Sequence, residues 1–150
     1  MKQTVILYAS VHHGNTRKVT EHLARQEGVT AVDLLHDPLP DLGSYDLVGF
    51  ASGIYFQAMH QRVRQALDQA VFRPGQAVFF LYTCGAPLGD GAKGLKKILA
   101  QKGIPWAGTF RCRGYDTYGP FGKLGGIAKG HPNARDLDRA AAFLRQLREA

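Results

Sequence analysis

Near its start the chain reads Tyr8-Ala9-Ser10-Val11-His12-His13-Gly14-Asn15-Thr16, directly after the apolar run Thr4-Val5-Ile6-Leu7. The apolar run predicts a buried strand, and the spacing of Val19 and Leu23 predicts a helix after the loop. The loop itself is rich in small and hydroxyl-bearing residues. Because the first N–H groups of a helix have no intrahelical acceptor, and because the helix dipole favours negative charge there, such a loop can hold an anion. The sequence therefore predicts a ligand that carries a phosphate.

Apolar strands and amphipathic helices alternate along the chain, which favours a parallel sheet with helices on both faces. Strands are predicted over Thr4–Ala9, Thr30–Leu34, Asp46–Ser52, Ala77–Tyr82 and Trp106–Cys112. Helices are predicted over Arg17–Gln26, around Val63–Ala70, around Leu95–Leu99 and from the N-cap residue Asn133 onward. With 150 residues and neither a repeat nor a linker, the chain is expected to form one α/β domain over residues 1–150.

The loop after the first strand carries a family resemblance. Ser10-Val11-His12-His13-Gly14-Asn15-Thr16 resembles the phosphate loop of the flavodoxin family, Ser/Thr-x-Thr-Gly-x-Thr, although it is one residue longer and has His12-His13 in place of the middle threonine. The residues that match are Ser10, Gly14, Asn15 and Thr16. The resemblance implies a three-layer α/β/α flavodoxin-like fold with a five-stranded parallel sheet of order 2-1-3-4-5. It also implies flavin mononucleotide (FMN) as cofactor.

Three loops at the carboxyl ends of the strands should meet at one edge of such a sheet. They span residues 10–16, 52–57 and 83–87, and in flavodoxin-like proteins they contact the phosphate, the ring face and the pyrimidine edge. Tyr55 or Phe56 could lie against a flat ring, with Gly53 freeing the backbone before them. The predicted cofactor-binding residues are Ser10, Val11, His12, His13, Gly14, Asn15, Thr16, Ser52, Gly53, Ile54, Tyr55, Phe56, Thr83, Cys84, Gly85 and Asp116.

The last of these residues, Asp116, belongs to a glycine-rich segment over Gly114–Gly126 that follows the fifth predicted strand. Long loops in small domains often have a function. Two interpretations remain open: the segment is a lid over the flavin, or it is a connector to the last helix.

The net charge of +7 is unevenly distributed. Residues 1–75 hold seven Lys/Arg and seven Asp/Glu, whereas residues 76–150 hold twelve and five, so the second half carries the whole excess. An acidic protein partner, an anionic substrate, nucleic acid and a merely solvated basic face are the possible explanations. Nucleic-acid binding rests on charge alone and is not expected.

The chain has two cysteines and six histidines, and neither set predicts a reactive centre. Cys84 and Cys112 end neighbouring predicted strands, so a disulfide is conceivable, but two reduced and buried thiols are the favoured interpretation. No histidine pair has zinc-ligand spacing with a cysteine nearby, so no metal site is predicted. No apolar run is long enough to span a bilayer and no secretory signal is evident, so a cytoplasmic location is expected.

The leading hypothesis is an FMN-binding electron-transfer protein that acts with a redox partner protein or a small anionic acceptor. No catalytic residue is predicted, because no Ser/His/Asp triad, carboxylate pair or catalytic-cysteine signature stands out. The alternative is a small FMN-dependent oxidoreductase acting on an organic acceptor, similar to quinone-reducing enzymes or flavodoxin-type protoporphyrinogen oxidases. A third hypothesis is a non-redox module of the same fold that binds another phosphate ligand or a protein.

Overall fold

A parallel sheet forms the centre of the protein in the computed structural model, which describes residues 1–116 and 125–150. The strand order is β2-β1-β3-β5-β6. The strands are β1 (Thr4–Ala9), β2 (Val29–Asp33), β3 (Leu47–Tyr55), β5 (Ala77–Cys84) and β6 (Trp106–Arg113). In chain order these are the first to fifth strands of the parallel sheet, so the predicted order 2-1-3-4-5 is confirmed for it.

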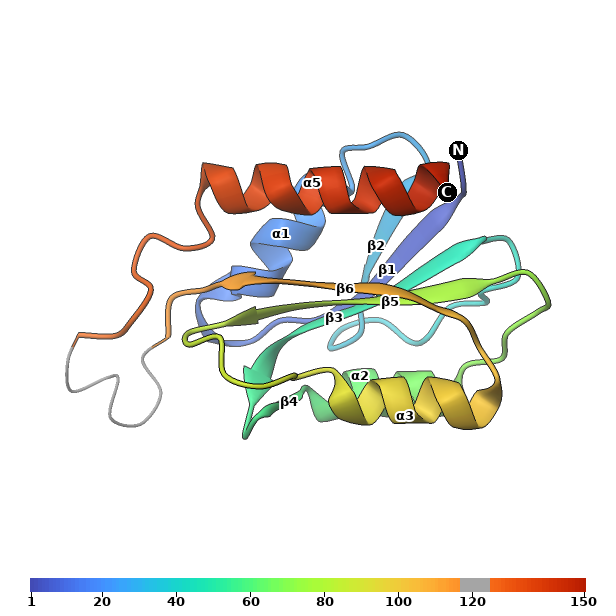
Figure 1. Cartoon of the computed structure of the whole chain (residues 1–150), viewed down its shortest axis with the longest axis horizontal. Helices are drawn as coiled ribbons and strands as arrows, with labels where there is room; N and C mark the ends of the chain where they lie inside the picture. The colour runs from blue at the N-terminus through green and yellow to red at the C-terminus, as the bar shows by residue number, and fades with distance from the viewer. Residues whose placement is uncertain (117–124) are drawn as a thin grey trace.

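Helices cover both faces of the sheet (Figure 1). Helices α1 (Asn15–Leu23) and α5 (Ala134–Glu149) lie on one face, and α2 (Gln61–Gln69) and α3 (Lys93–Lys102) lie on the other. A short 3₁₀ turn, η1 (His12–Gly14), precedes α1. The predicted N-cap of the last helix is confirmed: Asn133 and Asp136 form a reciprocal capping box. The three-layer α/β/α architecture is therefore as predicted.

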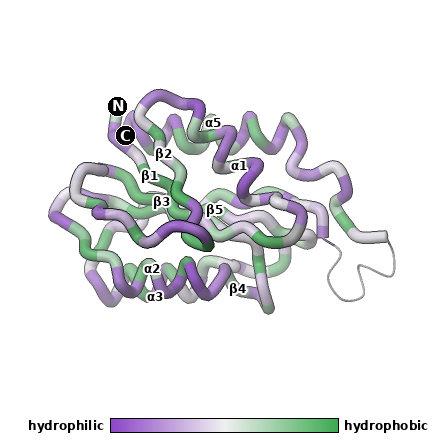
Figure 2. Tube along the Cα trace, turned by 180° about the vertical axis from the view of Figure 1, so that it is seen from behind, coloured by the Kyte–Doolittle hydropathy of each residue, from purple (hydrophilic) through white to green (hydrophobic). Residues whose placement is uncertain are grey.

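Two hydrophobic cores lie on the two sides of the sheet, because the central strands contribute buried residues to both. Figure 2 shows hydrophobic stretches along β1 and β3. The core beneath α2 and α3 contains Phe50, Phe80 and Cys84. The core beneath α1 and α5 contains Phe79, Leu144 and Cys112. The two cysteines are thus buried in different cores on opposite faces of the sheet, and both are free thiols, so no disulfide joins them.

The structure corrects the predicted ends of the strands. A two-residue strand, β4 (Ala58–Met59), pairs antiparallel with the end of β3 and was not predicted, so the described sheet has six strands instead of the predicted five. This hairpin extends β3 through Tyr55, so residues 53–55, which were predicted as loop, are strand residues. Similarly, β5 continues through Thr83 and Cys84, because both are paired with β6. Helix α1 begins at Asn15, two residues before the predicted start at Arg17.

In the described residues, no helix combines the length and the apolar character needed to cross a lipid bilayer.

Candidate functional site

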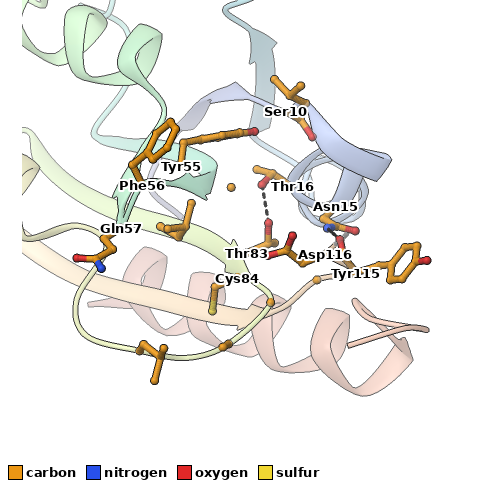
Figure 3. A pocket seen from close by; sticks show the side chains of 17 residues that line it. Ser10, Asn15, Thr16, Tyr55, Phe56, Gln57, Thr83, Cys84, Tyr115 and Asp116 are labelled. Carbon is orange, nitrogen blue, oxygen red and sulfur yellow. Dashed lines mark hydrogen bonds between the residues drawn. The ribbon is translucent and has the colours of Figure 1, made fainter. Parts of the chain in front are cut away.

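A cavity of about 430 Å³ opens at the carboxyl edge of the sheet (Figure 3). Most of the predicted site residues line it: Ser10, Val11, Asn15, Thr16, Gly53, Ile54, Tyr55, Phe56, Thr83, Cys84, Gly85 and Asp116. Gln57, Ala86, Leu88, Gly114 and Tyr115 line it as well, and they were not among the predicted site residues. Among the described side chains, His13, Gly14 and Ser52 are not part of its lining. The His12 side chain lies outside the part of the chain that the structure describes. The three predicted loops therefore do converge, and the segment after β6 supplies a fourth wall.

The first wall is the turn that leads into α1. His13 and Gly14 have left-handed backbone conformations, with φ of 58° and 63°, and Asn15 is right-handed. A change of hand between successive residues turns their N–H groups into a concave, anion-binding arrangement. The N-cap residue of α1 is Gly14, which has no side chain to accept a hydrogen bond from the helix. Ser10 partly takes this role, because its Oγ accepts from the Arg17 N–H at 3.1 Å. The remaining N–H groups of the first turn precede the intrahelical ladder and can meet an anion.

Two hydrogen bonds fasten this turn to the rest of the cavity wall (Figure 3). The hydroxyls of Thr16 and Thr83 lie 3.0 Å apart and join α1 to the end of β5. Asn15 Nδ2 donates to the Tyr115 carbonyl at 2.8 Å, across 100 residues of sequence. Gly114 makes room for this contact, because a Cβ there would lie 2.6 Å from Asn15 Nδ2. The turn is thus held from two directions before any ligand binds.

The second wall is the β3–β4 hairpin, which presents two aromatic rings. The Tyr55 ring meets the His60 ring edge-on at 5.2 Å, and a backbone hydrogen bond from Val11 reaches its hydroxyl. Burial raises the pKa of Tyr55, so the phenol stays protonated. Phe56 is 86% exposed at the mouth of the cavity. Tyr55 is therefore held from two sides, while Phe56 forms part of the rim.

Ser52 and His60 support this hairpin from behind. Ser52 Oγ accepts from the His60 N–H at 2.9 Å and donates to the Gly53 carbonyl at 2.7 Å. His60 caps α2, because its Nδ1 accepts from the Arg62 N–H at 2.9 Å. His60 is half-buried, because the Tyr55 ring covers it.

The third wall follows β5 and is bounded by arginines. Arg113 donates two hydrogen bonds to the Gly85 carbonyl, and Arg111 donates one to the Gly89 carbonyl. A Cβ on Gly85 would lie 2.6 Å from Asp116, so a larger residue here would force the Asp116 side chain to shift. Leu88, 84% exposed, adds a second exposed apolar side chain to the lining, besides Phe56.

The histidines of the phosphate turn and the glycine-rich segment are only partly described by the structure. The His13 ring is exposed and lies 4.5 Å from the Tyr115 ring. Tyr115 and Asp116 are anchored by backbone hydrogen bonds to His131 and Ile127. The hypothesis of a lid over Gly114–Gly126 concerns mainly residues 117–124, which lie outside the described residues. Within residues 1–116 and 125–150, no three His, Cys, Asp or Glu side chains are grouped to hold a metal ion.

Comparison with known proteins bears on what this edge of the sheet does. A family model of the flavodoxin domain matches residues 5–103. The chain belongs to the flavodoxin family. An uncharacterised protein of Methanocaldococcus jannaschii is 34% identical to this flavodoxin-family chain over 147 residues, covering 97% of both chains.

Solved structures share the fold of this flavodoxin-family protein. A flavodoxin from the domain Archaea has a TM-score of 0.68 at 12% identity and covers 97% of this chain and 96% of its own. The rubredoxin oxygen:oxidoreductase of Desulfovibrio gigas has a TM-score of 0.69 at 16% identity. That match covers 97% of this chain but only 35% of the oxidoreductase, so the shared part is about a third of that protein.

Proposed function

We propose that the cavity binds FMN and that the protein transfers electrons between the flavin and an acidic redox partner. The observation that carries this proposal is the pairing, within one cavity, of an anion-binding turn with aromatic side chains. The turn supplies the hydroxyls of Ser10 and Thr16, and the hairpin supplies Tyr55 and Phe56. A cavity of about 430 Å³ lies in the range of small-molecule sites. In the flavodoxin family, FMN is the ligand that has both a phosphate group and a flat aromatic ring.

Each wall has a task in this proposal. The N–H groups of the first turn of α1, with Ser10 and Thr16, bind the phosphate. Tyr55, held by Val11 and His60, presents its ring to the flat part of the cofactor. The backbone of Gly85 and Ala86 meets the pyrimidine edge. The flavin supplies the redox chemistry, and the protein holds it and tunes its surroundings.

The rim of the cavity favours an electron carrier over an enzyme. Phe56 and Leu88 leave more than four-fifths of their side chains exposed beside the cavity, and exposed apolar groups at a rim are typical of surfaces that meet a partner. The second candidate is an FMN-dependent oxidoreductase with a quinone or another organic acceptor, since the same apolar side chains can contact a flat apolar molecule.

Charge next to the rim favours an acidic partner. Helix α3 carries four lysines and no Asp or Glu, and Lys93 and Lys97 are exposed. Its N-terminal end lies against the cavity wall, because Gly91 closely approaches Ile54. The helix dipole disfavours a cation at this end, so the placement of Lys93 costs some stability, and its charge attracts anionic groups to the mouth of the cavity.

Titration with FMN and with riboflavin, followed by flavin fluorescence, tests the proposal. We expect FMN to bind at one equivalent and riboflavin, which lacks the phosphate, to bind more weakly. Thr16→Val should weaken FMN by roughly tenfold, with a smaller effect on riboflavin, because it removes a hydroxyl at the phosphate turn. Thr83→Val is the matched control: it breaks the same hydroxyl pair but lies away from the turn, and should change both affinities alike. FMN that keeps its free fluorescence beside the folded protein would rule out the proposal.

A further inference from the structure

We propose that Arg113 is a positioning residue for the cofactor site: it orients the Gly85–Ala86 peptide so that the Ala86 N–H points into the cavity. This inference rests on the proposed binding of FMN, and it concerns the pyrimidine edge of that cofactor. Arg113 itself does not line the cavity, so it acts through the backbone.

The hydrogen bonds of Arg113 fix the direction of one carbonyl group. Its Nε and Nη2 atoms both donate to the Gly85 oxygen, at 3.0 and 2.8 Å. Two bonds from one planar guanidinium restrain the acceptor in direction as well as in distance. The Gly85 carbonyl therefore points toward the Arg113 side chain on β6, which is not part of the cavity lining.

The direction of the Gly85 carbonyl determines the direction of the Ala86 N–H, because both belong to the same planar peptide group. Among the described residues, the cis peptide bond is His131–Pro132, so Gly85–Ala86 is trans. In a trans peptide the N–H points opposite to the C=O. Since the carbonyl points to Arg113, the Ala86 N–H points to the side on which Gly85 and Ala86 line the cavity.

The Ala86 N–H is available to a ligand. Over residues 1–116 and 125–150, the Ala86 N–H donates no backbone hydrogen bond. The peptide cannot easily rotate, because Asp116 packs against Gly85 so closely that even a Cβ there would lie 2.6 Å from the carboxylate. A fixed donor that faces a cavity suits an acceptor atom on the ligand, such as a carbonyl oxygen of the pyrimidine ring.

Arg113 also gives this donor a preference for negative charge. A cation bound to the carbonyl end of a peptide polarises it and strengthens the hydrogen bond from its N–H end. Reduced FMN carries negative charge on its ring, so the oriented N–H should favour the reduced form over the oxidised form. Arg113 would thereby help to set the ratio of the two affinities.

The chain provides a matched control in Arg111, two residues earlier on β6. Arg111 binds the Gly89 carbonyl at 2.9 Å instead of Gly85. Both guanidiniums lower the pKa of the Cys84 thiol in the cavity wall against the larger opposing effect of burial, so both act electrostatically on the cavity. Arg111→Gln removes the same charge as Arg113→Gln but leaves the Gly85–Ala86 peptide bound.

The experiment compares Arg113→Gln, Arg113→Lys and Arg111→Gln with the wild type, after urea unfolding has shown that each variant is folded. The first readout uses the protein without flavin: the amide resonance of Ala86 should shift in both Arg113 variants and stay near its wild-type position in Arg111→Gln. The second is the ratio of the dissociation constants for oxidised and reduced FMN. This ratio should fall by about tenfold in both Arg113 variants and by less than about twofold in Arg111→Gln.

The outcomes separate the two proposals. A wild-type protein that binds no FMN overturns the proposed function. Normal FMN binding with an unchanged ratio in the Arg113 variants overturns the positioning role alone. Equal falls in Arg113→Gln and Arg111→Gln, with a wild-type ratio in Arg113→Lys, would also overturn it, because net charge would then explain the effect.

Discussion

His60 connects three parts of the site through one imidazole ring. Its Nδ1 caps α2, its backbone N–H binds Ser52, and its ring supports Tyr55 in the cavity wall. Because Nδ1 accepts a hydrogen bond, the ring must be neutral in the folded protein. Burial also lowers the pKa of His60, because it removes water that would stabilise the charged ring. The hairpin should therefore weaken in acid.

We predict that the free energy of unfolding falls as the pH drops from 7 to 5, in part because of His60. The unfolded chain binds a proton near the ordinary histidine pKa of about 6.5, whereas the folded chain binds it only at lower pH. Protonation thus favours unfolding below about pH 6.5. His60→Asn keeps an N-cap acceptor but does not titrate, so urea unfolding at both pH values should show a smaller loss than in the wild type. An identical loss in both proteins would exclude this role.

The residues of the cavity differ in how well the sequence predicts them. The phosphate turn and the pair Tyr55-Phe56 could be predicted because small, hydroxyl-bearing and aromatic residues follow apolar strands. Tyr115 could not, since its contact with Asn15 spans 100 residues and no local pattern encodes it. Likewise, the sequence shows that Ser52 ends an apolar run, but only the hairpin reveals that its hydroxyl turns toward His60.

At the scale of elements, the β3–β4 hairpin is the unusual feature of the site. Its two-residue turn is Phe56-Gln57, and both residues have positive φ, 52° and 67°. Turns of this kind favour Asn and Gly, because a side chain in the left-handed region costs about 1 kcal/mol. The Phe56-Gln57 turn is strained, but it places an aromatic ring at the rim of the cavity. An Asn-Gly turn would avoid the strain and would have no ring there.

We expect Gln57→Gly to raise the free energy of unfolding by about 0.5–1 kcal/mol, because glycine adopts positive φ without strain. The same change at Gln65, within α2, should lower it by about 1 kcal/mol, since glycine is a poor helix former. Urea unfolding of the two variants measures both effects. A loss of stability in both would show that the turn carries no strain.

The strands of the sheet could be predicted where the apolar runs are long. The prediction failed where a strand pairs over only a few residues. Buried strands such as Ala77–Cys84 are hydrophobic almost throughout, and right-handed crossovers leave few ways to order them. The strand β4 has only two residues and no pattern of its own, so it was missed. The ends of β3 and β5 were missed with it, because pairing with neighbours, rather than composition, extends those strands into the site.

At the scale of the molecule, the basic excess is divided between two faces. The second half of the chain contributes α3 to one face of the sheet and α5 to the other (Figure 1). The exposed lysines Lys93 and Lys97 belong to α3, and the exposed arginines Arg135 and Arg145 belong to α5. The sequence could count these charges but could not assign them to faces, because the placement of helices depends on the crossovers.

We predict that electron transfer from the reduced, FMN-loaded protein to ferricyanide slows as salt is added, since salt screens the attraction of an anion to a basic surface. Replacing both Lys93 and Lys97 by Gln should reduce this salt dependence. The same double change at Arg135 and Arg145 removes equal charge from the other face and should leave the dependence near that of the wild type. Stopped-flow absorbance measures the rates. Equal slopes in all three proteins would contradict a specific role of α3.

The ends of the described chain lie side by side, far from the cavity. Arg148 Nε donates to the Lys2 carbonyl at 3.0 Å, at the edge of the sheet where β1 begins (Figure 1). The cavity opens at the opposite edge, where the strands finish. If the protein were immobilised on an electrode through either end of the described chain, its cavity would therefore face the solution. A linker of a few residues could also join these two ends in a circularly permuted chain without approaching the cavity.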